Sequence, residues 1–272
     1  MPFADTSLRD EYAAAVERVA GRTLDALRGA GGAVTLAEPG SDPATAHPLR
    51  PLLAAVRVLG PDMFAPQLFG GAAPDEQTAW LVAEAHEVFP SPAPPPPPWS
   101  SGVGDPDRDP DRDPDGPALI AAWRDWATGM LLTRSVHSVT AGGLPAPGVT
   151  APQPDHAPQP QPHAWQAWSV RMAQLSALAL PGLHGPVQET ALAHPTELAR
   201  GVVRSMLRRD HRVAARLARW LAWAQAQGQT LPLEIEPVLE RIHVVGDGSA
   251  RTALELAIAE ALLGTAVDGG QS

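Results

Sequence analysis

The segment PTELARGVVRSMLRRDHRVAARLARWLAWAQAQ, residues 195–227, decides the fold of this chain. Arginines recur along it at steps of three or four residues: Arg200, Arg204, Arg208, Arg212, Arg216 and Arg219. Because an α-helix turns once in about 3.6 residues, these steps place the arginines on one slowly turning stripe, with apolar residues on the opposite face. The segment therefore predicts either one long amphipathic helix or a helical hairpin in which Asp210 caps the second helix.

Six of the eight tryptophans form pairs three residues apart: Trp123/Trp126, Trp165/Trp168 and Trp220/Trp223. Residues at this spacing share one face of a helix, so each pair presents two indoles to a neighbouring surface. We expect Trp165 and Trp168 to be core residues, and Trp123 to be better aligned with its apolar stripe than Trp126. Trp223 lies at the edge between the apolar and arginine faces, and we expect it to be partly exposed.

The same periodicity predicts helices elsewhere in the chain. They are expected at about 7–28, 48–59, 74–89, 118–139, 163–180, 231–243 and 249–264. Thr6 and Ser7 are the expected caps of the first helix, and Trp80, Leu81 and Val88 are core candidates of the third. Strand signals are confined to residues 33–36 and 243–245. We therefore predict an all-α protein, a multi-helix bundle or stacked helical hairpins with Pro-rich disordered insertions.

Two segments interrupt the helical pattern. Residues 90–116 contain a proline run and a repeated D-P-D-R, and residues 140–162 are rich in Pro, Gln and Gly. Proline cannot occupy a helix interior and the aspartates repel one another, so both segments are expected to be extended or disordered. This predicts an N-terminal helical region, 1–89, a linker, 90–116, and a C-terminal helical region, 117–272, with a loop at 140–162. The two regions pack either separately or as one body.

The composition excludes several kinds of chemistry. The chain contains no Cys, Lys or Asn, which is typical of a GC-rich bacterial gene. Without Cys it has no thiol nucleophile or Cys-ligated metal, and without Lys it has no Schiff-base or phosphate-loop lysine. The formal net charge is -10, and no long apolar run or N-terminal signal pattern occurs. We therefore expect a cytoplasmic protein without membrane spans.

Three motif fragments are each incomplete. Residues 111–116 match the opening of an EF-hand loop, but Ala122 stands where a bidentate Glu is needed. Residues 246–248, G-D-G, lack the later glycine of a dinucleotide-binding loop, because Arg251 takes its place. Glu240 and His243 have the spacing of a di-iron ligand pair, but the chain has only one such pair. No catalytic, cofactor-binding or metal-binding residue is predicted.

The remaining indication of function is the uneven distribution of charge along the chain. Residues 196–227 carry seven arginines against Glu197 and Asp210, a net charge of +5 in an acidic chain. We expect a non-enzymatic interaction or scaffold protein that binds a partner protein, acidic if the arginine stripe binds it. The simplest alternative is a solvated or internally paired stripe, since every cation here must be Arg.

The predicted partner-binding residues are the six arginines of the stripe and Trp223. One alternative function is a small-molecule-binding or enzymatic α-bundle with a Trp-lined pocket. Another is nucleic-acid binding through the helix from Arg200 to Arg219, which is disfavoured because no aromatic residue alternates with the arginines. The identity of the partner and the oligomeric state stay open.

Overall fold

A computed structural model describes residues 3–29, 49–70, 76–90, 116–139, 152, 157–160 and 164–269. The N-terminal elements are α1 (Phe3–Leu27), α2 (Leu49–Leu59), the 3-10 helix η1 (Gly60–Phe64), α3 (Ala65–Gly70), α4 (Glu76–Val88) and α5 (Gly116–Val139). They are followed by α6 (Trp165–Gln174), the 3-10 helix η3 (Ser176–Leu178), α7 (Pro186–Ala193), α8 (Pro195–Leu207), α9 (His211–Ala226), α10 (Glu236–Val245) and α11 (Ala250–Gly269). The described part contains no strand, which confirms the all-α prediction.

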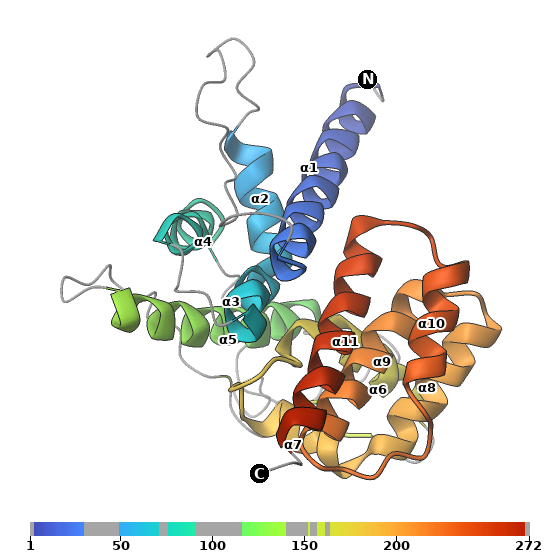
Figure 1. The fold of residues 1–272 in the computed structure, drawn as a ribbon. Helices are drawn as coiled ribbons and strands as arrows, with labels where there is room; N and C mark the ends of the chain where they lie inside the picture. Colours follow the sequence, from blue (N-terminus) through green and yellow to red (C-terminus); the bar gives the residue numbers. More distant parts are fainter. Residues whose placement is uncertain are drawn as a thin grey trace, which may run out of the picture.

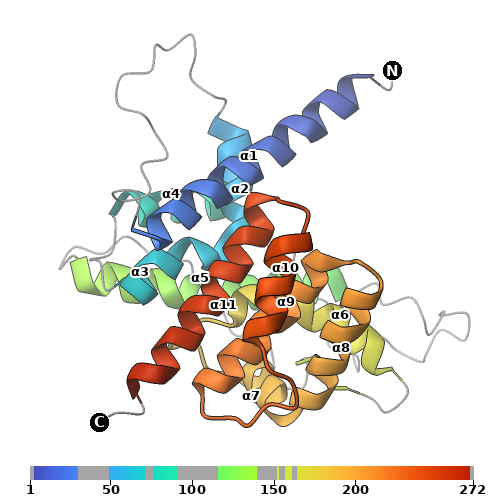
Figure 2. The same cartoon turned by 45° about the vertical axis from the view of Figure 1, so that its right-hand side comes forward.

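Helix α9 is the centre of the fold. It packs against α11, α8, α6 and α10, which surround it in the half of the molecule coloured yellow to red (Figure 1). Helices α1, α2, α4 and α5 lie beside this group, and α1 also packs on α11 (Figure 2). The buried apolar side chains form one continuous cluster that includes both groups. Within the described residues, no helix is both long enough and apolar enough to cross a membrane.

The predicted linker and loop fall largely on residues that the structure does not describe. Residues 91–115 lie outside the described part, as do most of residues 140–162. Contacts between α1 and α11, and between η1 and η3, nevertheless join the N-terminal helices to the C-terminal ones. The division into the regions 1–89 and 117–272 stays a prediction about how the chain folds, while the described helices of the two regions share one core.

Residues 195–227 form the helical hairpin, not the single long helix. The carboxylate of Asp210 accepts a hydrogen bond from the backbone N–H of Val213 at 3.1 Å, which caps α9 as predicted. Arg209 adopts the left-handed conformation, with a φ of 59°, and thereby reverses the chain direction. The bend divides the arginine stripe between α8, at the surface, and α9, at the centre.

Some element boundaries differ from the sequence prediction. Helix α1 begins at Phe3, so Thr6 and Ser7 lie inside the helix and do not cap it. Helix α10, which was expected to begin at residue 231, begins at Glu236. Residues 243–245, predicted as a possible strand, are the end of α10, whereas 33–36 lie outside the described residues. Helices α3 and α7 were not predicted. Proline begins α7 at its first position, where the missing N–H has no intrahelical partner to lose.

Five of the six paired tryptophans are buried, and Trp165 is half-buried. Trp123 is fully buried and Trp126 slightly less so, which confirms their predicted order. The prediction that Trp223 is partly exposed is wrong, because its side chain is only 1% exposed. Several helices pack on α9 and every residue from 217 to 224 is buried, so this part of α9 has no solvent-facing edge. Conversely, Trp80 and Val88, predicted as core, are 46% and 37% exposed.

The crossing of α8 with its neighbours depends on Gly201. A Cβ at this position would lie 2.8 Å from Cδ1 of Leu217 and 2.9 Å from Cβ of Ser169. We expect Gly201→Ala to lower the free energy of unfolding by about 1–3 kcal/mol through overpacking, despite the better helix propensity of alanine. The matched control is Gly264→Ala on α11, where a Cβ meets no atom within 4 Å. Urea unfolding should show this control to be more stable than wild type by about 0.5–1 kcal/mol. A stabilising effect of both variants would contradict the tight crossing.

Candidate functional site

A buried ion cluster joins elements that are far apart in the sequence. The guanidinium of Arg219 on α9 is completely buried. It donates hydrogen bonds to Asp62 on η1 at 2.7 Å, to Glu255 on α11 at 2.9 Å, and to the carbonyl of Ala179 at 3.2 Å. Ser176 Oγ donates to the other carboxylate oxygen of Glu255 at 2.9 Å. One arginine therefore ties η1, α9, α11 and the chain after η3 together.

The two carboxylates of this cluster have opposite pKa shifts. Burial raises the pKa of Asp62, which Arg219 opposes only in part and the charge of Glu255 reinforces. Burial alone would also raise the pKa of Glu255, but Arg219 and Arg216 outweigh it and hold that pKa below its ordinary value. Two neighbouring carboxyl groups whose pKa values differ also occur in the active sites of enzymes that use acid–base catalysis. Here Arg219 fills the space between the carboxylates, which are at most 10% exposed, so the arrangement serves structure.

A second ion pair attaches α5 to α2. Arg57 donates to Asp125 at 2.6 Å and to the carbonyl of Phe89 at 3.1 Å. Burial lowers the pKa of the nearby His86 to about 4, and the charge of Arg57 adds to this shift while Asp125 opposes it. His86 is therefore neutral in the folded protein at pH values where a solvated histidine takes up a proton.

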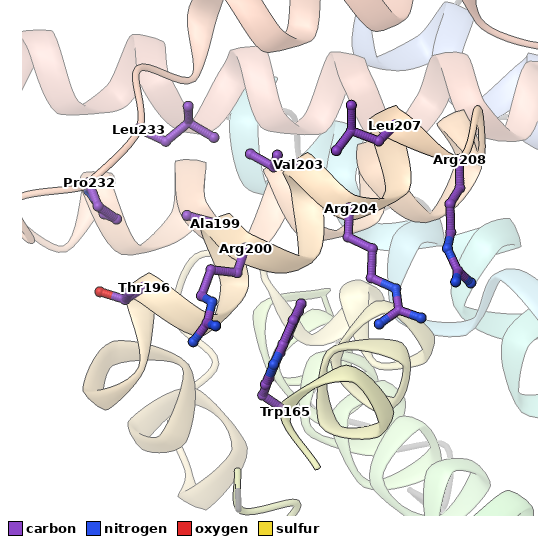
Figure 3. Close-up of a pocket in the computed structure, with 10 residues that line it drawn as sticks. All are labelled: Trp165, Thr196, Ala199, Arg200, Val203, Arg204, Leu207, Arg208, Pro232 and Leu233. Atoms are coloured by element: carbon purple, nitrogen blue, oxygen red, sulfur yellow. The ribbon is translucent and has the colours of Figure 1, made fainter. Parts of the chain in front are cut away.

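The described part has a concave surface along α8. Its volume is about 690 Å³. The residues that line it are Trp165, Thr196, Ala199, Arg200, Val203, Arg204, Leu207, Arg208, Pro232 and Leu233 (Figure 3). We call this surface the α8 groove. In Figure 3 the arginines and Trp165 lie on one side of α8, and Val203, Leu207 and Leu233 lie on the other.

The α8 groove combines cations, an aromatic ring and exposed apolar groups. The guanidinium carbon of Arg200 lies 4.8 Å from the ring centroid of Trp165, and that of Arg204 lies 5.8 Å from it. These contacts hold the two guanidinium groups against the indole face. Leu207 and Val203 are 81% and 47% exposed, which is unusual for aliphatic side chains in adjacent turns of one helix.

The structure divides the predicted partner-binding residues into three groups. Arg200, Arg204 and Arg208 line the groove and form no ion pair with any described residue. Arg212 pairs with Asp247 at 3.7 Å, and Arg216 lies 3.4 Å from Glu255. Arg219 and Trp223 are buried, so neither contacts a partner at the surface. The bend at Asp210 is the reason, because it turns the second half of the stripe inward.

Two features of these sites escaped sequence reasoning. Trp165 lies beside the arginines although it belongs to α6, so the absence of an aromatic residue within the arginine segment did not predict the groove. The paired acids Asp62 and Asp125 were also missed. Asp62 is a charged residue flanked by apolar ones, in GPDMF, and this local signal indicates a buried ion pair; Asp125 follows Arg124, in WRDWA, and has no such signal.

The buried position of His86 makes stability depend on pH. Its pKa is lower in the folded state than in the unfolded chain, so its contribution is fully present above about pH 6.5 and is lost as the pH falls towards 4. We expect the free energy of unfolding to decrease across this window by roughly 3 kcal/mol at most. His86→Gln should lose this part of the pH dependence when urea unfolding is measured at several pH values. Parallel pH profiles of the two proteins would refute the assignment.

Removal of Arg219 should cost more stability than removal of an exposed arginine. Arg219→Met leaves two carboxylates buried without a cation, and we expect it to cost about 3–5 kcal/mol. The control Arg212→Met removes the exposed pair with Asp247 and should cost less than about 1 kcal/mol. Chemical denaturation of both variants measures the difference. Equal losses of unfolding free energy in the two variants would show that the buried ion cluster contributes no more to stability than the exposed ion pair.

The described lining of the α8 groove consists of cations, an indole, apolar side chains and one hydroxyl group. Among the described lining residues Thr196 has the only hydroxyl, and none is a carboxylate or a histidine that could act as a general base. Within the described residues, no three His, Asp or Glu side chains gather as metal ligands. Comparisons with known protein families, with curated proteins and with solved structures found no match.

Proposed function

We propose that this protein is a non-enzymatic helical interaction protein that binds an acidic, amphipathic segment of a partner protein in the α8 groove. The observation that carries the proposal is the row of Arg200, Arg204 and Arg208, unpaired within the described residues, beside the exposed side chains of Val203 and Leu207. Both rows follow α8 at steps of four residues, so cationic and apolar contacts run in parallel along the groove.

Charge complementarity favours an acidic partner. The described residues that line the groove include three arginines and no carboxylate, and each guanidinium offers a planar set of donors that suits a carboxylate. Positive potential at such a patch speeds the association of acidic partners. Arg200 and Arg204 lie over the ring of Trp165, so a partner that binds these two arginines also lies close to this indole. Tryptophan side chains often anchor protein interfaces.

The apolar row favours a protein over a nucleic acid. A sugar-phosphate backbone would neutralise the arginines, and a base could stack on Trp165, so nucleic acid is the second candidate. A nucleic acid would leave Leu207 and Val203 exposed to water. An amphipathic protein segment covers them, and burial of this apolar surface adds to the free energy of binding. A Trp-lined small-molecule pocket receives less support, because five of the six paired indoles are packed in the core.

The test combines two groove substitutions with a charge-matched control. Arg204→Glu reverses a cation of the groove and Leu207→Glu removes its most exposed apolar side chain, while Arg18→Glu reverses an exposed cation on α1. A photo-reactive residue at Val203 of the full chain should cross-link, in the native host, to a partner segment rich in Glu or Asp and in apolar residues. That segment, made as a labelled peptide, is then titrated against each variant by fluorescence anisotropy.

We expect Leu207→Glu to weaken binding of the peptide by about tenfold or more, since burying a leucine contributes roughly 1.5–3 kcal/mol. Arg204→Glu should also weaken binding relative to wild type, by a factor that grows as the ionic strength falls and charges are screened less. Arg18→Glu should bind like wild type. Cross-links to nucleic acid, or equal binding by all four proteins, would refute the proposal.

A further inference from the structure

A smaller cavity lies beside the α8 groove. Its volume is about 230 Å³, and it is lined by residues of α6, of the end of α8 and of the beginning of α9. Its polar lining residues are Gln166, Ser169, Arg204, Ser205, Arg208 and Asp210. We call it the α6 cavity. Arg204 and Arg208 line both cavities, so these two side chains lie where the α6 cavity adjoins the α8 groove.

The two shared arginines point the same way. They are four residues apart, about 6 Å along α8, and Figure 3 shows their side chains extending from the helix in one direction. Neither Arg204 nor Arg208 forms an ion pair with a described residue. Each guanidinium presents several donors in one plane, so two of them one turn apart can donate to different oxygens of one bound anion.

A third donor in the α6 cavity is the hydroxyl of Ser205. A serine inside a helix can donate to the carbonyl four residues earlier, as Ser135 does to Leu131 at 3.0 Å. The Ser205 hydroxyl has no hydrogen-bond partner among the described residues, although this residue is only 8% exposed. Ser205 is therefore a nearly buried donor without an acceptor, and it lines the cavity. A ligand with acceptor oxygens supplies the missing partner.

Asp210 is the acid among the described lining residues of the α6 cavity. One of its oxygens accepts from the backbone N–H of Val213 at 3.1 Å, at the positive end of the α9 dipole. The guanidinium groups of Arg204 and Arg208 outnumber this carboxylate, so the described lining keeps an excess of positive charge. The carboxylate is also an acceptor, which suits a ligand that carries backbone N–H groups beside its negative charge. A phosphorylated residue within a peptide has both properties.

The size of the α6 cavity suits a phosphoryl group. Its volume corresponds to about eight water molecules at roughly 30 Å³ each. A carboxylate has two oxygens in one plane, whereas a phosphoryl group offers three strong acceptor oxygens in different directions. Three oxygens match the three unpartnered donors of Arg204, Ser205 and Arg208.

We infer that the α6 cavity binds a phosphoserine or phosphothreonine side chain of the partner protein, with Arg204, Ser205 and Arg208 as donors to its phosphoryl group. The inference rests on the proposed function, because the partner segment in the α8 groove carries the phosphoryl group. Since the two cavities adjoin at Arg204 and Arg208, a segment in the groove can extend one side chain into the α6 cavity. Phosphorylation adds a charge of about −1.5 to −2 there, so it regulates the affinity of the partner.

The test titrates small probes into the isotopically labelled full chain and follows the NMR signals of the arginine side chains. The probes are phosphoserine capped at both ends as a peptide unit, and glutamate and serine capped in the same way. We expect saturable binding of capped phosphoserine with a dissociation constant of about 1 mM. Capped glutamate should bind about fivefold or more weakly, because it offers less charge and fewer acceptor oxygens, and capped serine should not bind.

Two pairs of variants assign the binding to the α6 cavity. Arg208→Met and Ser205→Ala should each weaken the binding of capped phosphoserine by about fivefold or more. Arg200→Met and Thr196→Ala are the matched controls, because these residues line the α8 groove but are not among those that line the α6 cavity, and should bind like wild type. Alanine favours a helix more than serine does, so Ser205→Ala keeps α8 folded.

Three results with the probes would overturn the inference. Capped phosphoserine could fail to bind in a saturable way, or bind no more tightly than capped glutamate. The cavity variants could bind it as well as the groove variants do. Inorganic phosphate or glycerol phosphate, titrated in parallel, could bind as tightly as capped phosphoserine, which would assign the cavity to a free anion or to a lipid headgroup instead.

The cross-linked partner segment separates this inference from the proposed function. Its peptide is titrated with and without a phosphoryl group on its serine or threonine residue. Phosphorylation should tighten binding to wild type by about tenfold, and less so to Ser205→Ala. Equal binding of the two peptides would overturn the inference and leave the proposed function standing. Binding of capped phosphoserine without binding of either peptide would refute the proposed function, and the assignment to its partner with it.

Discussion

The guanidinium of Arg219 is the constraint on which the rest of the structure depends. It binds Asp62, which is 157 residues away in the sequence, and Glu255 on the last helix. Each of these charges is tolerable inside the protein only in the presence of the others, because burial of an unpaired carboxylate or guanidinium is very unfavourable. Alternative packings that separate η1 from α9 and α11 would leave these charges without their partners and are therefore disfavoured. The cluster thus contributes more to the choice of one packing than to net stability.

This constraint also explains how one arginine stripe acquires two roles. Helix α9 must lie at the centre so that Arg219 meets acids from both sides, and α8 then runs back along the surface after the bend at Asp210. The inner end of the stripe is consequently neutralised by acids from other helices. The outer end keeps Arg200 and Arg204 beside Trp165, with Arg208 further along the same groove. The same repeat of residues serves the core at one end and, in the proposed function, binds a partner at the other.

Sequence periodicity predicted most of the helices, since each depends on neighbours within about one turn, but it left one long helix and a hairpin as alternatives for residues 195–227. It was insufficient wherever a distant partner decides the outcome. Trp223 appeared to border a solvent-facing stripe, but the helices that pack on α9 bury it, and nothing within α9 encodes those contacts. Within the candidate site, the arginines of α8 were predicted from spacing, while Trp165 was assigned to the core. Its position beside Arg200 depends on how α6 crosses α8, which no local pattern specifies.

The acidity of the whole chain does not prevent an arginine site from attracting acids. At physiological ionic strength, charges in water are screened beyond about 8 Å. Arg200 and Arg208 are about 12 Å apart along α8, so an approaching carboxylate at the α8 groove senses chiefly these local cations and hardly the net charge of -10. Because every side-chain cation here is arginine, the patch also stays charged at any physiological pH. Recognition by this surface should therefore vary with salt far more than with pH.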